Sequence, residues 1–139
     1  MIRAHAVSHQ KTKDTSPVSW FVERMAAIRD GAPDTLFYVS CDVPEVQEEI
    51  CSRFGNCVAQ REKGSYNSVA GVKSAVVDLY LLANSSFMLA PHFSSFLHIA
   101  RHLGRDRVPF ETPVTPPRAG FREVSLGMAS DPVQPWLRN

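Results

Sequence analysis

Residues 1–104 alternate between short, nearly continuous apolar runs and longer segments in which apolar positions recur at helical spacing. A short apolar run covered on both faces is typical of a parallel strand. The predicted strands are residues 2–7, 35–40, 56–60 and 86–91. The predicted helices are residues 17–30, 43–54, 69–85 and 94–103. Strand–helix alternation with short connections predicts an α/β fold, a Rossmann-like parallel sheet with flanking helices.

Local residue choices support the ends of these helices. Ser16 stands before Pro17, an N-cap residue followed by proline at the preferred first helical position. Ser68 is placed to begin the third helix, and Gly104 to close the fourth. Two apolar faces follow from the spacing: Val18, Phe21, Val22, Met25 and Ala26 in the first helix, and Val43, Val46, Ile50 and Phe54 in the second.

The composition changes after Gly104. Residues 106–139 hold six of the ten prolines, a density that argues against regular structure. We therefore divide the chain into a Rossmann-like domain, residues 1–105, and a Pro-rich extended tail, residues 106–139. Four apolar residues could fasten that tail onto the domain: Phe110, Phe121, Leu126 and Trp136.

Charge and composition narrow the classes of partner. The chain is 44% hydrophobic and 21% charged, with a formal net charge of +1. So small a net charge gives no overall attraction to nucleic acid or to an anionic membrane. No apolar stretch reaches the ~20 residues of a membrane span, and the first residues lack the apolar segment of a signal peptide. As written, the chain is expected to be cytoplasmic.

Neither cysteines nor histidines suggest a metal. Cys41, Cys51 and Cys57 include no C-x-x-C pair, which excludes the zinc spacings and any obvious disulfide framework. His98 and His102 stand four residues apart without a third ligand. We therefore expect reduced cysteines and no metal cofactor.

Two acidic residues stand at places where an α/β fold can bind ligands. Asp42, after the second strand, is followed by Glu45, so it is either a helix cap or an acceptor for a nucleotide's ribose or base. Asp78 shares a small-residue helix face with Gly71, Ser74 and Ala75. Inside so apolar a helix, its carboxylate needs a donor, either from the protein backbone or from a ligand.

The stretch after the fourth strand, His92–Phe96, places two serines where a helix begins. Helix N-termini present free N–H groups and a positive dipole end, so Ser94 and Ser95 either cap the helix or help it to bind an anion. Capping is the commoner role. His5, at the end of the first strand, lies on the same predicted edge.

Taken together, "TLFYVSCDVPEVQEEICSRFG" and "SVAGVKSAVVDLYLLANSSFMLAPHFSSFLHIARHLG" resemble the C-terminal half of fucosyltransferases of the α-1,6, nodulation and peptide O-fucosyl types. The resemblance covers about residues 2–104. It implies a GT-B glycosyltransferase whose donor is GDP-fucose, with no metal. Donor contacts would come from seven residues: His5, Asp42, Asp78, His92, Ser94, Ser95 and Phe96.

The chain also departs from the family pattern. Val7 stands where the family's H-x-R motif places an arginine that neutralises the leaving diphosphate. His9 or Lys11 could substitute, but neither offers a bidentate fork. In addition, 139 residues do not hold the second GT-B half that binds the glycan or protein acceptor.

Two functions therefore remain open. One is a fucosyltransferase-like domain that binds a nucleotide sugar, either degenerate or a piece of a larger transferase, which in a eukaryote would work in the Golgi or ER lumen. The other is a non-catalytic interaction module that kept the fold and lost the ligand. Half a GT-B fold would expose an apolar surface, so we also expect a second domain or chain, or self-association.

Overall fold

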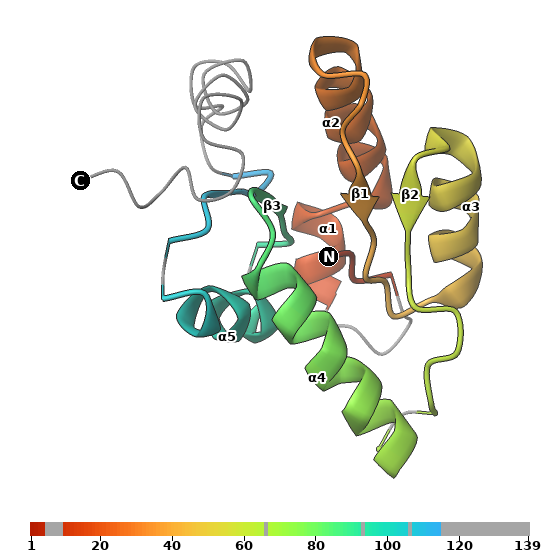
Figure 1. The fold of residues 1–139 in the computed structure, drawn as a ribbon, viewed down its shortest axis with the longest axis vertical. Coiled ribbons are helices and arrows are strands. Elements are labelled where there is room, and N and C mark those ends of the chain that lie inside the picture. The colour runs from red at the N-terminus through yellow and green to blue at the C-terminus, as the bar shows by residue number, and fades with distance from the viewer. Residues whose placement is uncertain (5–9, 66, 93, 106, 115–139) are drawn as a thin grey trace.

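The computed structural model describes residues 1–4, 10–65, 67–92, 94–105 and 107–114 (Figure 1). The helices in these ranges are α1 (Gln10–Thr15), α2 (Val18–Gly31), α3 (Pro44–Phe54), α4 (Val69–Ala83) and α5 (Ser95–Leu103). The strands are β1 (Phe37–Tyr38), β2 (Cys57–Val58), β3 (Met88–Leu89) and β4 (Phe110–Glu111). A mixed α/β chain is thus confirmed, and each of the four predicted helices is present.

The strands are parallel, as predicted, but they form two pairs and no single regular sheet. β1 pairs with β2, and β3 pairs with β4. The first residues of the chain lie between the pairs: the Ile2 N–H donates to the Ser40 carbonyl at 2.8 Å, and the Met1 nitrogen donates to the Leu89 carbonyl at 2.9 Å. Of the predicted strand 2–7, Ile2 forms only an isolated parallel bridge with Cys41, and residues 5–9 lie outside the described ranges.

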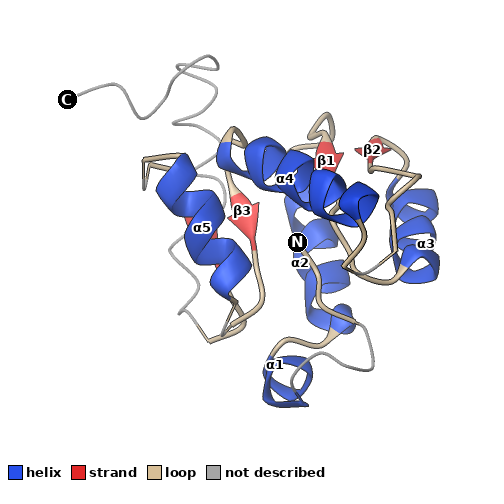
Figure 2. Cartoon of the chain, turned by 90° about the horizontal axis from the view of Figure 1, so that it is seen from below, coloured by secondary structure: helices blue, strands red, loops and turns tan. Residues whose placement is uncertain are grey.

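Side chains along these segments alternate between two apolar clusters, because successive strand residues point to opposite faces. Ile2, Val39 and Cys41 belong to the cluster that packs under α2 and α3, whereas Met1, Met88 and Ala90 belong to the cluster under α4 and α5. The strand segments therefore separate two helical layers. Figure 1 shows α3 beside β2, and Figure 2 shows α4 next to α5, with which it packs.

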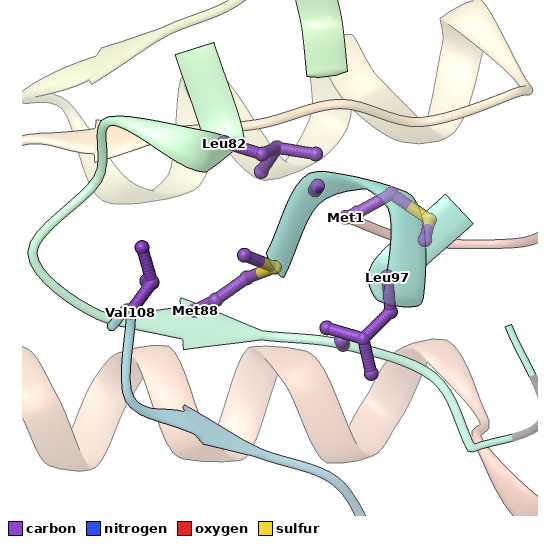
Figure 3. Close-up of a cluster of buried hydrophobic side chains, with 7 residues drawn as sticks. Met1, Leu82, Met88, Leu97 and Val108 are labelled. Atoms are coloured by element: carbon purple, nitrogen blue, oxygen red, sulfur yellow. The ribbon is translucent and has the colours of Figure 1, made fainter. Parts of the chain in front are cut away.

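The second cluster joins parts of the chain that are far apart in sequence (Figure 3). Its labelled members converge from the first residue, the end of α4, β3, α5 and the segment before β4: Met1, Leu82, Met88, Leu97 and Val108. All five are at most 7% exposed. This cluster is what fixes the start of α5 against the strands.

The apolar faces predicted for the two N-terminal helices face the first cluster. In α2, Phe21 and Met25 are buried there, and in α3 so is Ile50. The predicted cap at Ser16 is wrong: Pro17 is the N-cap residue of α2, and no side chain caps this end of the helix. Ser16 is buried, and its hydroxyl instead accepts the His92 N–H at 2.9 Å.

Helix α4 is oriented with its small-residue face inward. Asp78 is buried and Gly71, Ser74 and Ala75 are half-buried, while an apolar face points to solvent. The residues of this α4 apolar face are Val69, Val72, Val76, Val77, Tyr80 and Leu81. Each is at least 44% exposed, so α4 buries the less hydrophobic of its faces.

The described part of the Pro-rich segment, residues 107–114, contains the strand β4. Phe110, which the sequence offered as a fastening residue, belongs to β4. Next to it, the Glu111 carboxylate accepts two hydrogen bonds from the Arg24 guanidinium of α2, at 2.7 and 2.8 Å. This bidentate pair ties β4 to the N-terminal half of the chain. Phe121, Leu126 and Trp136 lie outside the described residues.

Candidate functional site

Asp78 accepts four side-chain hydrogen bonds. Its Oδ1 accepts from the Tyr38 hydroxyl at 2.5 Å and from the Gln60 amide, and its Oδ2 accepts from the Ser40 hydroxyl at 2.5 Å and the Lys63 ammonium at 2.9 Å. We call these five residues the Asp78 cluster. The residue is only 4% exposed, so its carboxylate is buried but paired and fully hydrogen-bonded.

The local sequence explains how these donors meet. Tyr38 and Ser40 are two residues apart on the same extended segment, so both face α4. The Gln60 amide also donates to the Ser74 carbonyl at 2.9 Å, a contact that the small residues of α4 permit by letting the backbone come close. The Gln60 carbonyl in turn accepts from the Gln47 amide of α3 at 2.7 Å. The cluster thus links α3, both strands of one pair and α4.

The donors decide the charge of Asp78. Burial works to raise its pKa, but the hydrogen bonds from Ser40, Tyr38 and Lys63 outweigh burial, so the pKa of Asp78 lies below its usual 3.8. Conversely, burial and the hydrogen bond to Asp78 raise the pKa of the Tyr38 hydroxyl. The cluster therefore holds a carboxylate anion beside a neutral tyrosine.

Asp42 lies on the same side of the strands but has different partners. Its Oδ1 accepts the Ala4 N–H at 2.7 Å, and its Oδ2 lies 3.5 Å from an Arg3 guanidinium nitrogen. The helix-cap prediction for Asp42 is wrong, because Val43 is the N-cap of α3 and no side chain caps that end. The carboxylate instead fixes the backbone of the first residues against the end of β1.

Arg3 connects Asp42 to the start of α5. Its guanidinium carbon lies 5.4 Å from the centre of the Phe96 ring, within the range of a cation–π contact. The Arg3 side chain is 37% exposed, and with five N–H donors it keeps donors beyond its contact with Asp42. Asp42 and Phe96, two of the predicted donor-binding residues, are thereby brought to one place.

The two serines of the α5 start have different environments. Ser94 is the N-cap: its hydroxyl accepts the Leu97 N–H at 3.3 Å, and the residue is 6% exposed. Ser95, the first residue of α5, is exposed. His92 is half-buried beside them. Capping is therefore the role that the geometry gives Ser94, and Ser95 is the hydroxyl that faces solvent.

Some of the predicted site falls outside the described residues. His5, together with Val7 and His9, is in the range 5–9. In the ranges that the structure does describe, no group of three His, Cys, Asp or Glu side chains could hold a metal ion. Among the same residues, no helix is long and apolar enough to cross a membrane.

The sequence analysis did not identify the two cations of this edge, Arg3 and Lys63. Lys63 donates to the Cys41 carbonyl at 3.1 Å as well as to Asp78, so this member of the Asp78 cluster also contacts the residue that precedes Asp42. The rule that ligands bind at the carboxyl ends of parallel strands, applied to the strand 56–60, would have found Lys63. Nothing in the sequence pattern distinguishes Arg3.

Comparison of the chain with family models, curated proteins and solved structures found no match. The functional assignment therefore depends on the site itself.

Proposed function

We propose that the chain is a fucosyltransferase-like domain that binds a nucleotide sugar of the GDP-fucose type. The binding site is the edge where the strand segments end. There the Arg3 guanidinium contacts both the Asp42 carboxylate and the ring of Phe96, and the exposed Ser95 precedes Phe96 at the start of α5. This observation carries the proposal, because a diphosphate requires a cation and free donors at a helix N-terminus.

Arg3 also bears on the missing arginine of the family motif. The resemblance places an arginine at Val7, and Arg3 offers a guanidinium from the same N-terminal segment. Its planar fork matches two phosphate oxygens, which neither His9 nor Lys11 can do. Arg3 therefore binds the diphosphate in this proposal, and Ser95 and the first N–H groups of α5 supply further donors.

The strand arrangement is compatible with this function. Hydrogen bonds place the segments in the order β2, β1, residues 1–2, β3 and β4, all parallel where they pair. In a doubly wound domain such an order puts the first strand in the middle and the binding crevice at its carboxyl end. Residue Arg3 follows directly from that central segment. The proposed fold is accordingly the donor-binding, Rossmann-like half of a GT-B enzyme.

Asp78 has an indirect part in the proposed site. Both of its oxygens are occupied by protein donors. It therefore positions Lys63 and Tyr38 near the ligand, and a direct contact with the nucleoside requires one of these donors to move aside. Asp42, whose side chain is more exposed than that of Asp78, is the better acceptor for the ribose or base.

Isothermal titration with GDP, GDP-fucose, UDP and ADP, first without metal and then with magnesium, tests the proposal. We expect selective binding of the guanine ligands without metal. Arg3→Gln should weaken GDP binding about tenfold or more, because a charge-assisted hydrogen bond contributes about 1.5–3 kcal/mol. Arg53→Gln, in the last turn of α3, is the matched control and should leave affinity unchanged.

Two serine variants distinguish an effect on ligand binding from an effect on stability. Ser95→Ala should weaken GDP binding and leave stability nearly unchanged, whereas Ser94→Ala should lose about 1 kcal/mol of stability with the helix cap. Absence of heat from all four nucleotides, on a folded sample, would exclude the donor-binding function.

The α4 apolar face favours the second candidate, a non-catalytic interaction module. Six large apolar side chains on one exposed helix face form an unusual surface for a protein without a partner. In that case the partner binds α4, and saturating GDP or GDP-fucose leaves the melting temperature unchanged. A rise in melting temperature with GDP and GDP-fucose, but not with UDP or ADP, would decide for the first candidate.

A further inference from the structure

Two of the three cysteines meet in the folded chain. The sulfur atoms of Cys51 and Cys57 are 2.8 Å apart, and both residues are half-buried and reduced. A disulfide bond is about 2.05 Å long, so the sulfurs need to approach by less than about 1 Å to bond. Cys41, the third cysteine, is buried among α2, α3 and the strands.

The backbone holds the pair in place from both sides. Cys51 lies in the last turn of α3, and the chain reverses at Gly55, whose φ of 68° suits glycine and whose N–H donates to the Cys51 carbonyl. Cys57 is the first residue of β2 and is paired with Phe37 of β1. The contact therefore follows from the α3–β2 packing and needs no flexible loop.

We propose that Cys51 and Cys57 form a dithiol modification site that a small-molecule disulfide oxidises to an intramolecular disulfide. A thiolate of the pair attacks one sulfur of the small disulfide, forming a mixed disulfide and releasing one small thiol. The second cysteine then attacks the mixed disulfide, which closes the protein disulfide and releases the other small thiol. Two electrons and two protons pass to the two released thiols. This site does not depend on the proposed nucleotide-sugar function.

The environment of the two sulfurs sets the order of attack. Burial and the hydrogen bond with Cys51 raise the pKa of the Cys57 thiol to about 12. Cys57 therefore keeps its proton while the thiols are free, and Cys51 attacks first. Once Cys51 is in the mixed disulfide, the hydrogen bond that helps to raise the pKa of Cys57 is gone, while burial still raises it, and Cys57 attacks the neighbouring sulfur in turn.

The disulfide would join α3 covalently to β2 just before Gln60. Gln60 donates to Asp78 and is itself held by Gln47 of α3. Oxidation thus fixes the segment that supplies one donor of the Asp78 cluster.

The test is an equilibrium with reduced and oxidised glutathione, measured on the full chain in buffer and in urea. After acid quenching and alkylation, mass spectrometry identifies which cysteines are linked. We expect the 51–57 disulfide to form with an equilibrium constant at least about tenfold larger in the folded chain than in urea, since folding brings the sulfurs together. An equal or smaller constant in the folded chain would overturn the proposal.

Three variants make the assignment specific. Cys41→Ala should form the same disulfide, and its failure to do so would show that Cys41 is one of the pair. With oxidised glutathione, Cys57→Ser should stop at a mixed disulfide of Cys51. In Cys51→Ser, Cys57 should form its mixed disulfide more slowly than Cys51 does in Cys57→Ser. Faster reaction of Cys51→Ser would contradict the order of attack.

Discussion

Asp78 is the residue on which the polar contacts of the structure converge. A buried carboxylate without partners costs several kcal/mol, but here four donors and the charge of Lys63 offset that cost. The donors come from β1, from Ser40 two residues after it and from the loop after β2, so the carboxylate holds both of these segments against α4.

Replacing Asp78 by asparagine should destabilise the fold by about 2–3 kcal/mol, because the amide cannot accept from all four donors and leaves the Lys63 charge without its partner. Urea unfolding followed by circular dichroism measures the change. Asp34→Asn, at an exposed aspartate, is the control and should change stability by less than about 0.5 kcal/mol. Equal effects of both variants would show that the cluster contributes little.

The same carboxylate predicts how stability depends on pH. Its pKa is lower in the folded chain than the usual 3.8, so its contribution is fully present above about pH 4. That contribution is lost as the pH falls through the folded pKa, since the unfolded chain binds the proton first. Urea unfolding measures the free energy of unfolding at pH 7 and at pH 3. Between these two pH values, that free energy should fall less for Asp78→Asn than for the unaltered chain. A parallel loss in both proteins would contradict this assignment.

At the scale of elements, α4 shows how packing overrules hydrophobicity. Its periodicity identifies two faces, a small one and an apolar one, and the apolar face would be the ordinary choice for burial. The small face is buried instead, because Gln60 donates to the Ser74 carbonyl and the loop at Gly64 crosses the helix at Gly71. Side-chain size along one face, rather than mean hydropathy, decides the orientation of this helix.

Gly71→Ala should destabilise the chain although alanine is the better helix former by about 1 kcal/mol. A Cβ atom at this position would meet the Ser65 carbonyl oxygen, a backbone atom that cannot turn away. Thermal unfolding should give a lower melting temperature. Gly31→Ala, at the exposed last residue of α2, is the control and should leave the melting temperature unchanged or higher. A higher melting temperature for Gly71→Ala would mean that the loop at Gly64 and Ser65 does not lie against α4.

Over the whole molecule, contacts between distant segments set the arrangement. Residues 1–2 lie between the two strand pairs, and β4 comes from beyond residue 106. The Arg24–Glu111 pair spans most of the described chain. These long-range contacts leave the α4 apolar face without a covering element among the described residues.

We expect the chain to self-associate through the α4 apolar face at high micromolar concentration. Val72→Glu combined with Val76→Glu should weaken that association at least about tenfold, because charges in a desolvated interface oppose it. Ile99→Glu, on the exposed side of α5, is the matched control. Light scattering over a concentration series measures the effect. A strictly monomeric chain at these concentrations would contradict the expectation.

From the sequence alone, the elements whose cause is local could be predicted. Apolar spacing and the Ser68 cap account for α4, and the inward faces of α2 and α3 match the residues chosen from periodicity. Asp78 was also identified, because a carboxylate in an apolar helix requires donors wherever they come from. Its donors were not, since they are supplied by two strands and a loop.

Tertiary structure decided what depends on distant contacts. Ser16 does not cap α2, and its hydroxyl accepts the His92 N–H. The Asp42 carboxylate accepts the Ala4 N–H, and the Arg3 guanidinium lies over the Phe96 ring. Tertiary structure also brought Cys51 to Cys57. A hydrogen bond or a cation–π contact depends on positions in space, whereas periodicity reports only which face of an element is apolar. Local propensity therefore determined the elements, and packing determined the site.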